Sequence, residues 1–343
     1  MEKIHEKRSR KDTLFRLLGI TTVLLLTLAA IGGAAPFAYI TNYGDNTTSV
    51  IDTATNSIVS TINAGNQPWA AAVSPDGSKV YIANNASNNI SVINTTTYNI
   101  TASINVGNEP AGIAVSPDGI RIYVTNSGDN TTSIINATNN TVIATIPVGI
   151  GPAGVAVSPD GSKVYVANGA YIENETYNST VSVIDTATNT VVSNIVVGNG
   201  PIGVAFTPDG TRAYVTNGAE NTTSVINTTD NTVIATVSVG NSPWGIAITP
   251  DGSKAYVANS AILVNLTYNN STVSVIDTSN NTVISTVPVG AFPWGVAATP
   301  DGTKVYVTNA LSGDVSVINT STNKVTTNIP VGMGPMTLGQ FIG

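Results

Sequence analysis

The stretch GPAGVAVSPDGSKVYVAN, residues 151–168, decides the fold of this chain. Two apolar runs, 155–157 and 164–166, flank a Pro-Asp-Gly turn. Asp-Gly between β-forming residues is a strong hairpin signal. The stretch therefore predicts one β-hairpin, and nearly the same hairpin recurs along the chain.

The second strand of this hairpin recurs as Tyr-[Val/Ile]-[Thr/Ala]-Asn, starting at Tyr39, Tyr81, Tyr123, Tyr165, Tyr214, Tyr256 and Tyr306. A period of about 40–45 residues with four strands per unit is typical of propeller blades. Each unit supplies an apolar strand before Pro-Asp-Gly, the tyrosine strand, a Ser-Val-Ile-[Asp/Asn] strand and a Thr-Val-Ile-Ala-Thr-like strand. A Gly-x-x-Pro linker then leads to the next unit.

The two ends of the repeat array are complementary. The first unit begins at Phe37 inside its second strand and lacks a first strand, whereas residues 334–343 align with 151–157. We therefore expect an all-β fold in residues 36–343: a seven-bladed β-propeller of four-stranded antiparallel blades, in which the C-terminal strand completes blade 1. Such closure removes an open sheet edge.

Seven tyrosine motifs and six Pro-Asp-Gly copies make the chain similar to the YVTN-family seven-bladed β-propellers of archaeal surface-layer and cell-surface proteins. The resemblance implies a cell-surface propeller. It implies no reaction, because this fold hosts many functions. Related propellers that are enzymes or carry metals use histidines that the propeller region of this chain lacks.

Residues 1–35 differ from the rest in composition. A basic cluster is followed by an apolar stretch, 17–30, and by small residues up to Ala35. This order predicts a signal peptide, and the alternative is an uncleaved membrane anchor over 17–35. In both cases we expect residues 36–343 to be extracellular or at the cell surface, with membrane contact only through the N-terminal segment.

The composition beyond residue 35 restricts partners and chemistry. Seven Lys+Arg stand against 17 Asp+Glu, which argues against nucleic acid and anionic membranes. There is no Cys, and the one histidine is His5, so no Ser-His-Asp triad, Cys-His pair or usual zinc site is available. We expect no catalytic residues, no metal, no cofactor and no enzymatic activity. The rival is a carboxylate-based lyase or hydrolase, for which the acids of the insertions are Glu173 and Glu175.

Charged and polar residues recur at fixed repeat positions. Six cations follow the turn: Lys79, Arg121, Lys163, Arg212, Lys254 and Lys304. We expect them to solubilise the hairpins while the turn aspartate holds the turn, and the alternative is a ring of charge that binds a ligand. Asp or Asn ends each third strand, which predicts Asx turns, with calcium binding as the alternative.

The chain contains 17 Asn-x-Ser/Thr sequons. In an exported protein such sites are glycan acceptors on surface loops. The candidates are Asn46, Asn85, Asn94, Asn130, Asn174, Asn221, Asn265 and Asn319.

The copies differ at two places. Insertions lie at 169–180, with Tyr171 and Tyr177, and at 260–272, with Tyr268. The residue after the linker proline is bulky in blades 1, 2, 6 and 7, which are consecutive on a closed ring: Trp69, Trp244, Trp294 and Met336. Both kinds of connection emerge on one face, so we expect a ligand site at that channel mouth for a sugar or a peptide. The alternative is that the tryptophans only plug the channel.

The leading functional hypothesis is a non-enzymatic cell-surface or surface-layer propeller that acts as an envelope structural, adhesion or protein-interaction module. Its partners would be other envelope proteins or surface glycans. The alternative is a carbohydrate- or peptide-binding receptor that uses the Trp-lined channel mouth.

Overall fold

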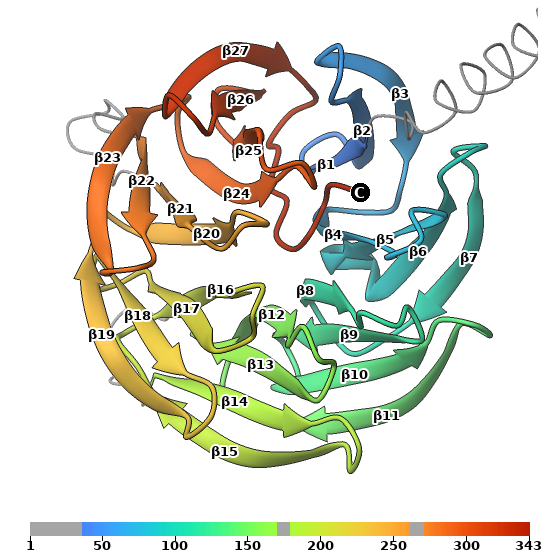
Figure 1. Ribbon diagram of the computed structural model, residues 1–343. Helices are drawn as coiled ribbons and strands as arrows, with labels where there is room; N and C mark the ends of the chain where they lie inside the picture. Colours follow the sequence, from blue (N-terminus) through green and yellow to red (C-terminus); the bar gives the residue numbers. More distant parts are fainter. Residues whose placement is uncertain (1–35, 170–178, 261–270) are drawn as a thin grey trace, which may run out of the picture. The chain divides into compact units, whose positions relative to one another are not determined.

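The computed structural model describes residues 36–169, 179–260 and 271–343. Over these residues the unit Pro36–Gly343 forms seven antiparallel sheets arranged around a central axis (Figure 1). The predicted all-β, seven-bladed propeller is confirmed. In this part of the chain no helix has the length and apolar character needed to cross a membrane.

Each blade has four strand positions, counted outward from the axis. The inner strands are β4 (Pro68–Val73), β8 (Pro110–Val115), β12 (Pro152–Val157), β16 (Pro201–Phe206), β20 (Pro243–Ile248) and β24 (Pro293–Ala298). The second strands are β1 (Phe37–Asn42), β5 (Lys79–Asn84), β9 (Arg121–Asn126), β13 (Lys163–Asn168), β17 (Arg212–Asn217), β21 (Lys254–Asn259) and β25 (Lys304–Asn309).

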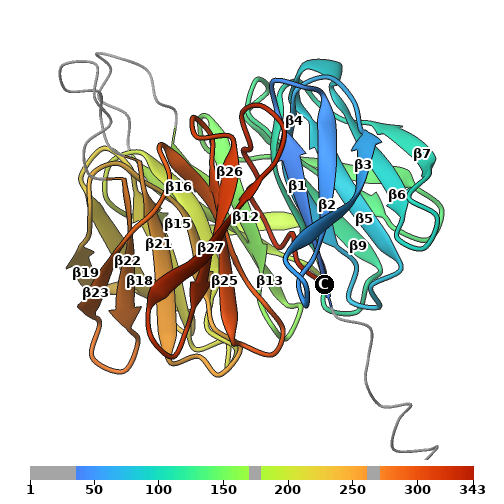
Figure 2. The same cartoon turned by 90° about the horizontal axis from the view of Figure 1, so that it is seen from above.

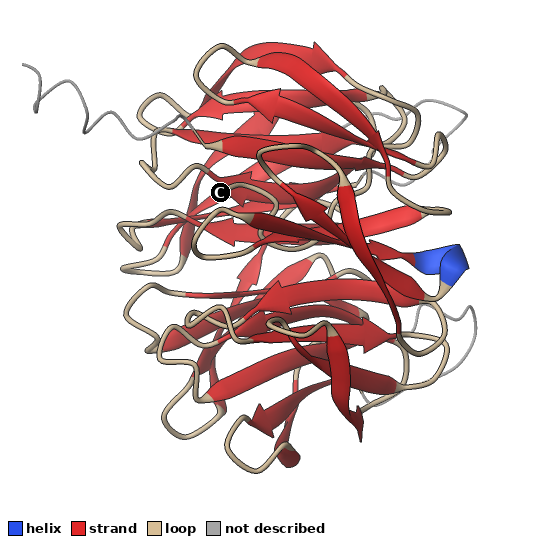
Figure 3. Ribbon diagram, turned by 90° about the vertical axis from the view of Figure 1, so that its right-hand side faces the viewer, coloured by secondary structure: helices blue, strands red, loops and turns tan. Residues whose placement is uncertain are grey.

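The third and outer strands complete the sheets. The third strands are β2 (Thr47–Asp52), β6 (Asn89–Asn94), β10 (Thr131–Asn136), β14 (Thr180–Asp185), β18 (Thr222–Asn227), β22 (Thr272–Asp277) and β26 (Asp314–Asn319). The outer strands are β3 (Ser57–Asn63), β7 (Ile100–Asn105), β11 (Thr141–Pro147), β15 (Thr190–Val196), β19 (Thr232–Ser238), β23 (Thr282–Pro288) and β27 (Lys324–Pro330). One 3-10 turn, η1 (Asn85–Ser87), interrupts the described β structure (Figure 3).

The hairpin at 151–168 forms as predicted. It consists of β12 and β13, in which Val155 pairs with Val166 and Ala156 with Tyr165. Gly161 has φ +73°, a conformation that glycine adopts without steric cost, and its N–H donates to the Ser158 carbonyl at 2.8 Å. The turn type therefore explains the Asp-Gly pair.

The core lies between neighbouring blades. The motif tyrosines are all fully buried, and Tyr165 Oη donates to Asn231 Oδ1 of the next blade at 2.6 Å. Buried Val and Ile side chains of the second and third strands pack around them. Adjacent apolar residues on these strands are thus explained by burial on both faces of each sheet.

The motif asparagine and the linker glycine fit each other closely. Asn84 Nδ2 donates to Asn89 Oδ1 and to Ser91 Oγ, both at 2.9 Å. A Cβ placed on Gly65 would lie 2.4 Å from Asn84 Cγ. Only glycine allows the linker to approach this side chain, and the same contact recurs at Gly107, Gly149, Gly198, Gly240, Gly290 and Gly332.

The last nine residues close the ring. Residues 335–343 pair with β1 on one side, where Tyr39 N–H donates to the Phe341 carbonyl at 2.9 Å. On the other side they contact β4, where Ala71 N–H donates to the Leu338 carbonyl at 3.0 Å. The C-terminal segment therefore supplies the missing inner strand of blade 1, as predicted.

The strands run between two opposite faces of the propeller (Figure 2). We call the side with the Gly-x-x-Pro linkers and the connections between second and third strands the loop face. The opposite side carries the Pro-Asp-Gly turns and the Asx turns, and we call it the turn face. On the turn face Thr95 Oγ1 donates to the Gly77 carbonyl at 2.7 Å, which ties the two kinds of turn together.

The closing segment can be tested at Phe341, whose side chain is fully buried in the core of blade 1. We predict that Phe341→Ala lowers the free energy of unfolding by about 3–5 kcal/mol, because a large buried aromatic leaves a cavity. Urea denaturation measures this change. Met333→Ala is the control, since Met333 is 63% exposed. Equal midpoints for the two variants would show that the segment does not hold the ring.

Candidate ligand-binding face

The residue after the linker proline has the same position in every blade. It is the second residue of each inner strand, at the loop-face end, and Met336 takes this place in the C-terminal segment. Proline is tolerated as the first residue of a strand, where its missing N–H is not needed. Inner strands surround the axis, so these seven residues meet around one mouth of the channel.

Aromatic side chains from blades 1, 2, 6 and 7 make continuous contact at this mouth. Trp69 and Trp294 pack edge to face with ring centroids 5.5 Å apart. The ring centroids of Trp244 and Trp294 are 3.6 Å apart, and the angle between the two ring planes is 31°. Tyr43 contacts Trp69 at 5.5 Å, and Phe292 contacts Trp294 at 5.6 Å. We call these five residues the aromatic cluster.

The cluster combines a buried centre with accessible flanks. Trp294 is only 4% exposed, whereas Trp69 and Trp244 are half-buried. Apolar residues from the opposite arc, Ile202 and Ala153, belong to the same packed group, as does Met336. Trp294 therefore fills the mouth, as the plug alternative expected, while Trp69 and Trp244 keep surface on the loop face. The predicted ligand site stays a prediction.

Two indole N–H groups have no acceptor among the described residues. Trp244 Nε1 and Trp294 Nε1 are both buried and make no hydrogen bond to the described residues. Leaving a buried donor unpaired costs about 1–3 kcal/mol. Unpaired buried donors are uncommon in folded proteins and need an explanation, such as a bound molecule that accepts from them.

Several predicted sites lie outside the described residues. These are the tyrosines and sequons of the two insertions: Tyr171, Tyr177, Tyr268, Asn174 and Asn265.

The other sequon asparagines take part in turns. On the loop face Asn46, Asn130 and Asn221 have positive φ, and their Oδ1 atoms accept the N–H of a linker residue at 2.8 Å. On the turn face Asn94 and Asn319 accept backbone N–H groups in Asx turns, as the sequence predicted. Asn85 Nδ2 donates to the Pro110 carbonyl at 3.4 Å. These contacts fix the side chains and leave their glycosylation a prediction.

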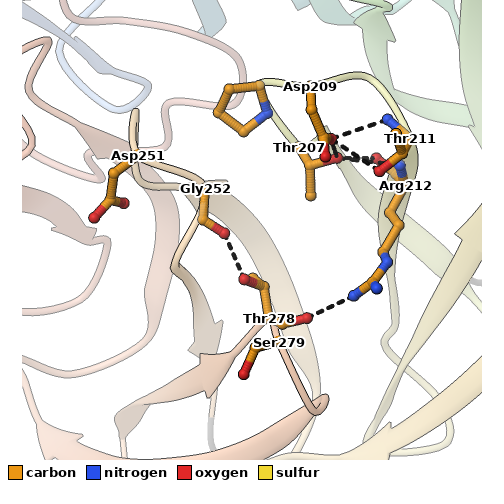
Figure 4. A pocket seen from close by; sticks show the side chains of 9 residues that line it. Thr207, Asp209, Thr211, Arg212, Asp251, Gly252, Thr278 and Ser279 are labelled. Carbon is orange, nitrogen blue, oxygen red and sulfur yellow. Dashed lines mark hydrogen bonds between the residues drawn. The ribbon is translucent and has the colours of Figure 1, made fainter.

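The turn face holds an open depression of about 340 Å³ between blades 5 and 6 (Figure 4). Arg212 Nη1 donates to the Thr278 carbonyl at 2.6 Å, and Asp209 accepts from Thr207 Oγ1 at 2.6 Å and from Thr211 N–H at 3.0 Å. The same contacts recur between other blades. The polar groups here are occupied within the fold, so this depression is not our candidate site.

The cations of the turn face have a role that the sequence did not indicate. Each of the six that begin a second strand donates to a backbone carbonyl in the next blade, as Lys163 Nζ does to Thr228 at 2.6 Å and Lys254 Nζ to Thr320 at 2.6 Å. These bonds add a structural role to the expected one of solubilising the hairpins. They bridge blades, because a long side chain at the start of a second strand reaches the neighbouring Asx turn.

Hydrogen bonds keep the turn aspartates ionised. Ser74 Oγ donates to Asp76 at 2.6 Å and Ser78 N–H at 3.0 Å, and together they lower the pKa of this carboxyl from 3.8 to about 2. The pKa values of the motif tyrosines are shifted upward, because burial disfavours the ionised phenolate, and that of Tyr81 is raised to about 12. No three His, Cys, Asp or Glu residues in the described ranges are grouped to hold a metal ion.

The lowered pKa of Asp76 predicts a pH-dependent contribution to stability. A carboxyl with a folded-state pKa near 2 stabilises the protein above its ordinary value of 3.8, and this contribution is lost as the pH falls toward 2. Asp76→Asn should therefore unfold at lower urea than the wild type at pH 7, and the two midpoints should converge by about pH 2. A difference that is independent of pH would contradict this role.

Residues 184–329 match a family described as "Lactonase, 7-bladed beta-propeller". The match begins in blade 4, includes blades 5 and 6 and ends within the outer strand of blade 7, less than half of the chain. No curated protein matches the chain significantly.

Two solved structures show the same fold at low identity. Hydrazine synthase from Kuenenia stuttgartiensis has a TM-score of 0.70 and 22% identity, over 79% of this chain and 88% of that chain. A functionally unknown protein from Desulfotomaculum acetoxidans DSM 771 has a TM-score of 0.73 and 20% identity, over 88% and 99% of the two chains. These similarities support the propeller fold alone.

The expectation that the chain is not an enzyme is contradicted by the lactonase match at 184–329. It was based on the absence of histidine and cysteine from the propeller. That absence excludes triads, but carboxylates and tyrosines remain as possible acid–base groups.

Proposed function

We propose that this chain is an exported, cell-surface β-propeller that binds a ligand with flat apolar faces on the aromatic cluster. The observation that carries the proposal is the convergence of Tyr43, Trp69, Trp244, Phe292 and Trp294 from blades at both ends of the chain. The half-buried Trp69 and Trp244 offer the surface on which such a ligand stacks.

The physical basis is the character of the aromatic surface. Aromatic rings bury a large apolar area, and ring contacts contribute about 0.5–1.5 kcal/mol beyond that area. A few polar groups beside such a surface fix a ligand's orientation. The indole N–H groups of Trp244 and Trp294 lack a described acceptor but are buried, so the groups that orient a surface ligand must come from neighbouring residues.

The cellular role that fits this site is an envelope module. The leader at 1–35, the sequons and the resemblance to YVTN propellers support export and a place at the cell surface, in a surface layer or in adhesion. The partners would be other envelope proteins or surface glycans. Recovery of the protein from the cytoplasm alone would contradict this role.

Tryptophan fluorescence tests the site directly. We expect sugars or peptides from the envelope to quench or shift the emission, and Trp244→Ala to weaken binding more than about tenfold because a stacking surface is lost. Trp69 and Trp294 remain as reporters in this variant.

Ile202→Ala is the matched control for Trp244→Ala. Ile202 has the same repeat position on the opposite arc, where blades 3 and 4 carry Ala111 and Ala153. The ligand affinity of the Ile202→Ala variant should stay within about twofold of the wild type. Trp244→Ala, in contrast, should lose about tenfold or more, which corresponds to about 1.4 kcal/mol. Equal losses in both variants, or no response to any ligand, would overturn the proposal.

Lactone hydrolysis is a second candidate function, and the family match at 184–329 favours it. In this reaction water attacks the carbonyl carbon of the ring ester, the C–O bond opens, and a hydroxy acid forms with release of a proton. Among the described loop-face carboxylates, Asp45 accepts from Met333 N–H at 2.6 Å and Asp129 from Asn108 N–H at 2.7 Å. Asp45 and Asp129 thus hold loops, Asp314 accepts from Asn309 Nδ2 at 2.7 Å, and no described contact distinguishes Glu109 or Glu220 as a general base.

A pH-stat assay with a panel of five- and six-membered lactones tests this candidate. A lactonase would release acid well above the spontaneous rate, and heat-unfolded protein would not. Acid release equal to that in buffer for every lactone would remove this candidate and leave the binding proposal unchanged.

A further inference from the structure

The residue before each linker proline has a left-handed backbone conformation. In blades 4, 5 and 1 it is glycine: Gly151, Gly200 and Gly334 have φ of +59°, +64° and +63°. In the other four blades it carries a side chain. Gln67, Glu109, Ser242 and Phe292 have φ of +51°, +53°, +47° and +59°.

A side chain at this position is unfavourable. The left-handed region brings Cβ close to the following carbonyl oxygen, whereas glycine has no Cβ and adopts it freely. Strained residues of this kind persist where the surroundings hold them, and they gather at functional sites. Three of the four strained residues precede a tryptophan by two positions: Gln67, Ser242 and Phe292 stand before Trp69, Trp244 and Trp294.

Hydrogen bonds fix the backbone of Gln67 and Ser242, whereas their side chains make no hydrogen bond to the described residues. Gln67 N–H donates to Asn46 Oδ1 at 2.8 Å, and its carbonyl accepts from Asn85 N–H at 3.0 Å. Ser242 is fixed in the same way by Asn221 and Ser260. Neither the Gln67 amide nor the Ser242 hydroxyl bonds to another described residue, and both residues are half-buried.

The loop face carries no described cation. Of the seven Lys and Arg residues after residue 35, six begin second strands and Lys324 begins β27, all at the turn face. Segments 170–178 and 261–270 contain no Lys or Arg in their sequence. Acidic residues do occur on this face: Asp45, Glu109, Asp129, Glu220 and Asp314. Because like charges repel, an anionic ligand is disfavoured here.

The arrangement also disfavours a peptide that binds by strand addition. Such peptides gain their affinity by pairing with an exposed sheet edge. The loop face presents linkers and turns, whereas the outer strands lie at the perimeter of the propeller (Figure 1). A sugar ring needs no sheet edge, because it offers an apolar face for stacking and hydroxyl groups around its rim.

We infer that the ligand is an uncharged carbohydrate, stacked on the aromatic cluster and hydrogen-bonded by the Gln67 amide and the Ser242 hydroxyl. This inference rests on the proposed binding function. The two residues determine specificity, and the left-handed backbone positions their polar groups beside the tryptophans that follow them.

Glycine substitutions test the two residues without disturbing the linker. Gln67→Gly and Ser242→Gly introduce the residue that blades 1, 4 and 5 already carry, so we expect unchanged or higher Tm. Affinity for short neutral oligomers of glucose, mannose or N-acetylglucosamine, measured by calorimetry, should fall about three- to tenfold in each variant through the lost hydrogen bond.

Glu109→Gly is the matched control. It relieves the same backbone conformation in blade 3, but Ala111 takes the place of a tryptophan there. Its Tm should respond as in the other two variants, while its affinity stays within about twofold of the wild type.

The outcomes separate this inference from the proposal beneath it. If no sugar binds, or if binding is insensitive to Trp244→Ala, the binding function itself fails. If binding depends on Trp244 but the Gln67 and Ser242 variants match Glu109→Gly, the assignment of these two residues is wrong. Tighter binding of oligogalacturonate or of a blocked peptide would contradict the uncharged carbohydrate, and a lower Tm in the glycine variants would show a structural role.

Discussion

Residues 335–343 hydrogen-bond to β1 on one side and contact β4 on the other, so the last strand of the chain holds its first blade. The geometry of the loop face depends on this closure. Trp69 lies in blade 2 and Trp294 in blade 7, and their rings come within 5.5 Å only because blade 1 joins these two blades. In an open array of blades, neither tryptophan would have the other as a partner. The constraint that stabilises the ring is therefore the same one that forms the candidate site.

The repeat and its exceptions have different roles. Residues shared by all blades make contacts within and between blades, such as the motif asparagine against the linker glycine and the turn-face cation on the next blade. These contacts engage the Nδ2 group of the motif asparagine and the terminal nitrogen of the cation, whereas the buried Oδ1 of each motif asparagine has no hydrogen-bond partner among the described residues. The tryptophans and the residues before the linker prolines vary between blades. Within the described residues, the side chains of Gln67 and Ser242 and the indole N–H groups of Trp244 and Trp294 have no hydrogen-bond partner. In a fold built from copies, the positions where the copies differ are the ones available for binding.

The fold could be predicted from the sequence because its determinants are local. Pro-Asp-Gly specifies the turn at Gly161, and the offset between the first and last units specifies closure by 335–343. The contacts between blades could not be predicted from the sequence, because they join residues that are distant along the chain. Lys163 donates to the backbone carbonyl of Thr228, which lies 65 positions away along the chain. Every residue has such a carbonyl, so the sequence does not indicate which one Lys163 reaches. Thr125, which bridges to the Ala153 carbonyl at 2.6 Å, has alanine counterparts in blades 2, 4 and 6, a pattern whose meaning is visible only in three dimensions.

The candidate site was predictable in part. The shared position of Trp69, Trp244 and Trp294 indicated one channel mouth, but not that Tyr43 and Phe292 join them. Glycine before proline in three blades signals a left-handed residue there, and this signal could have identified Gln67 and Ser242. The most direct measurement is a crystal structure of the protein with a neutral oligosaccharide. Our account predicts a sugar ring against Trp69 or Trp244 on the loop face, whereas a sugar bound on the turn face or at the perimeter would contradict it.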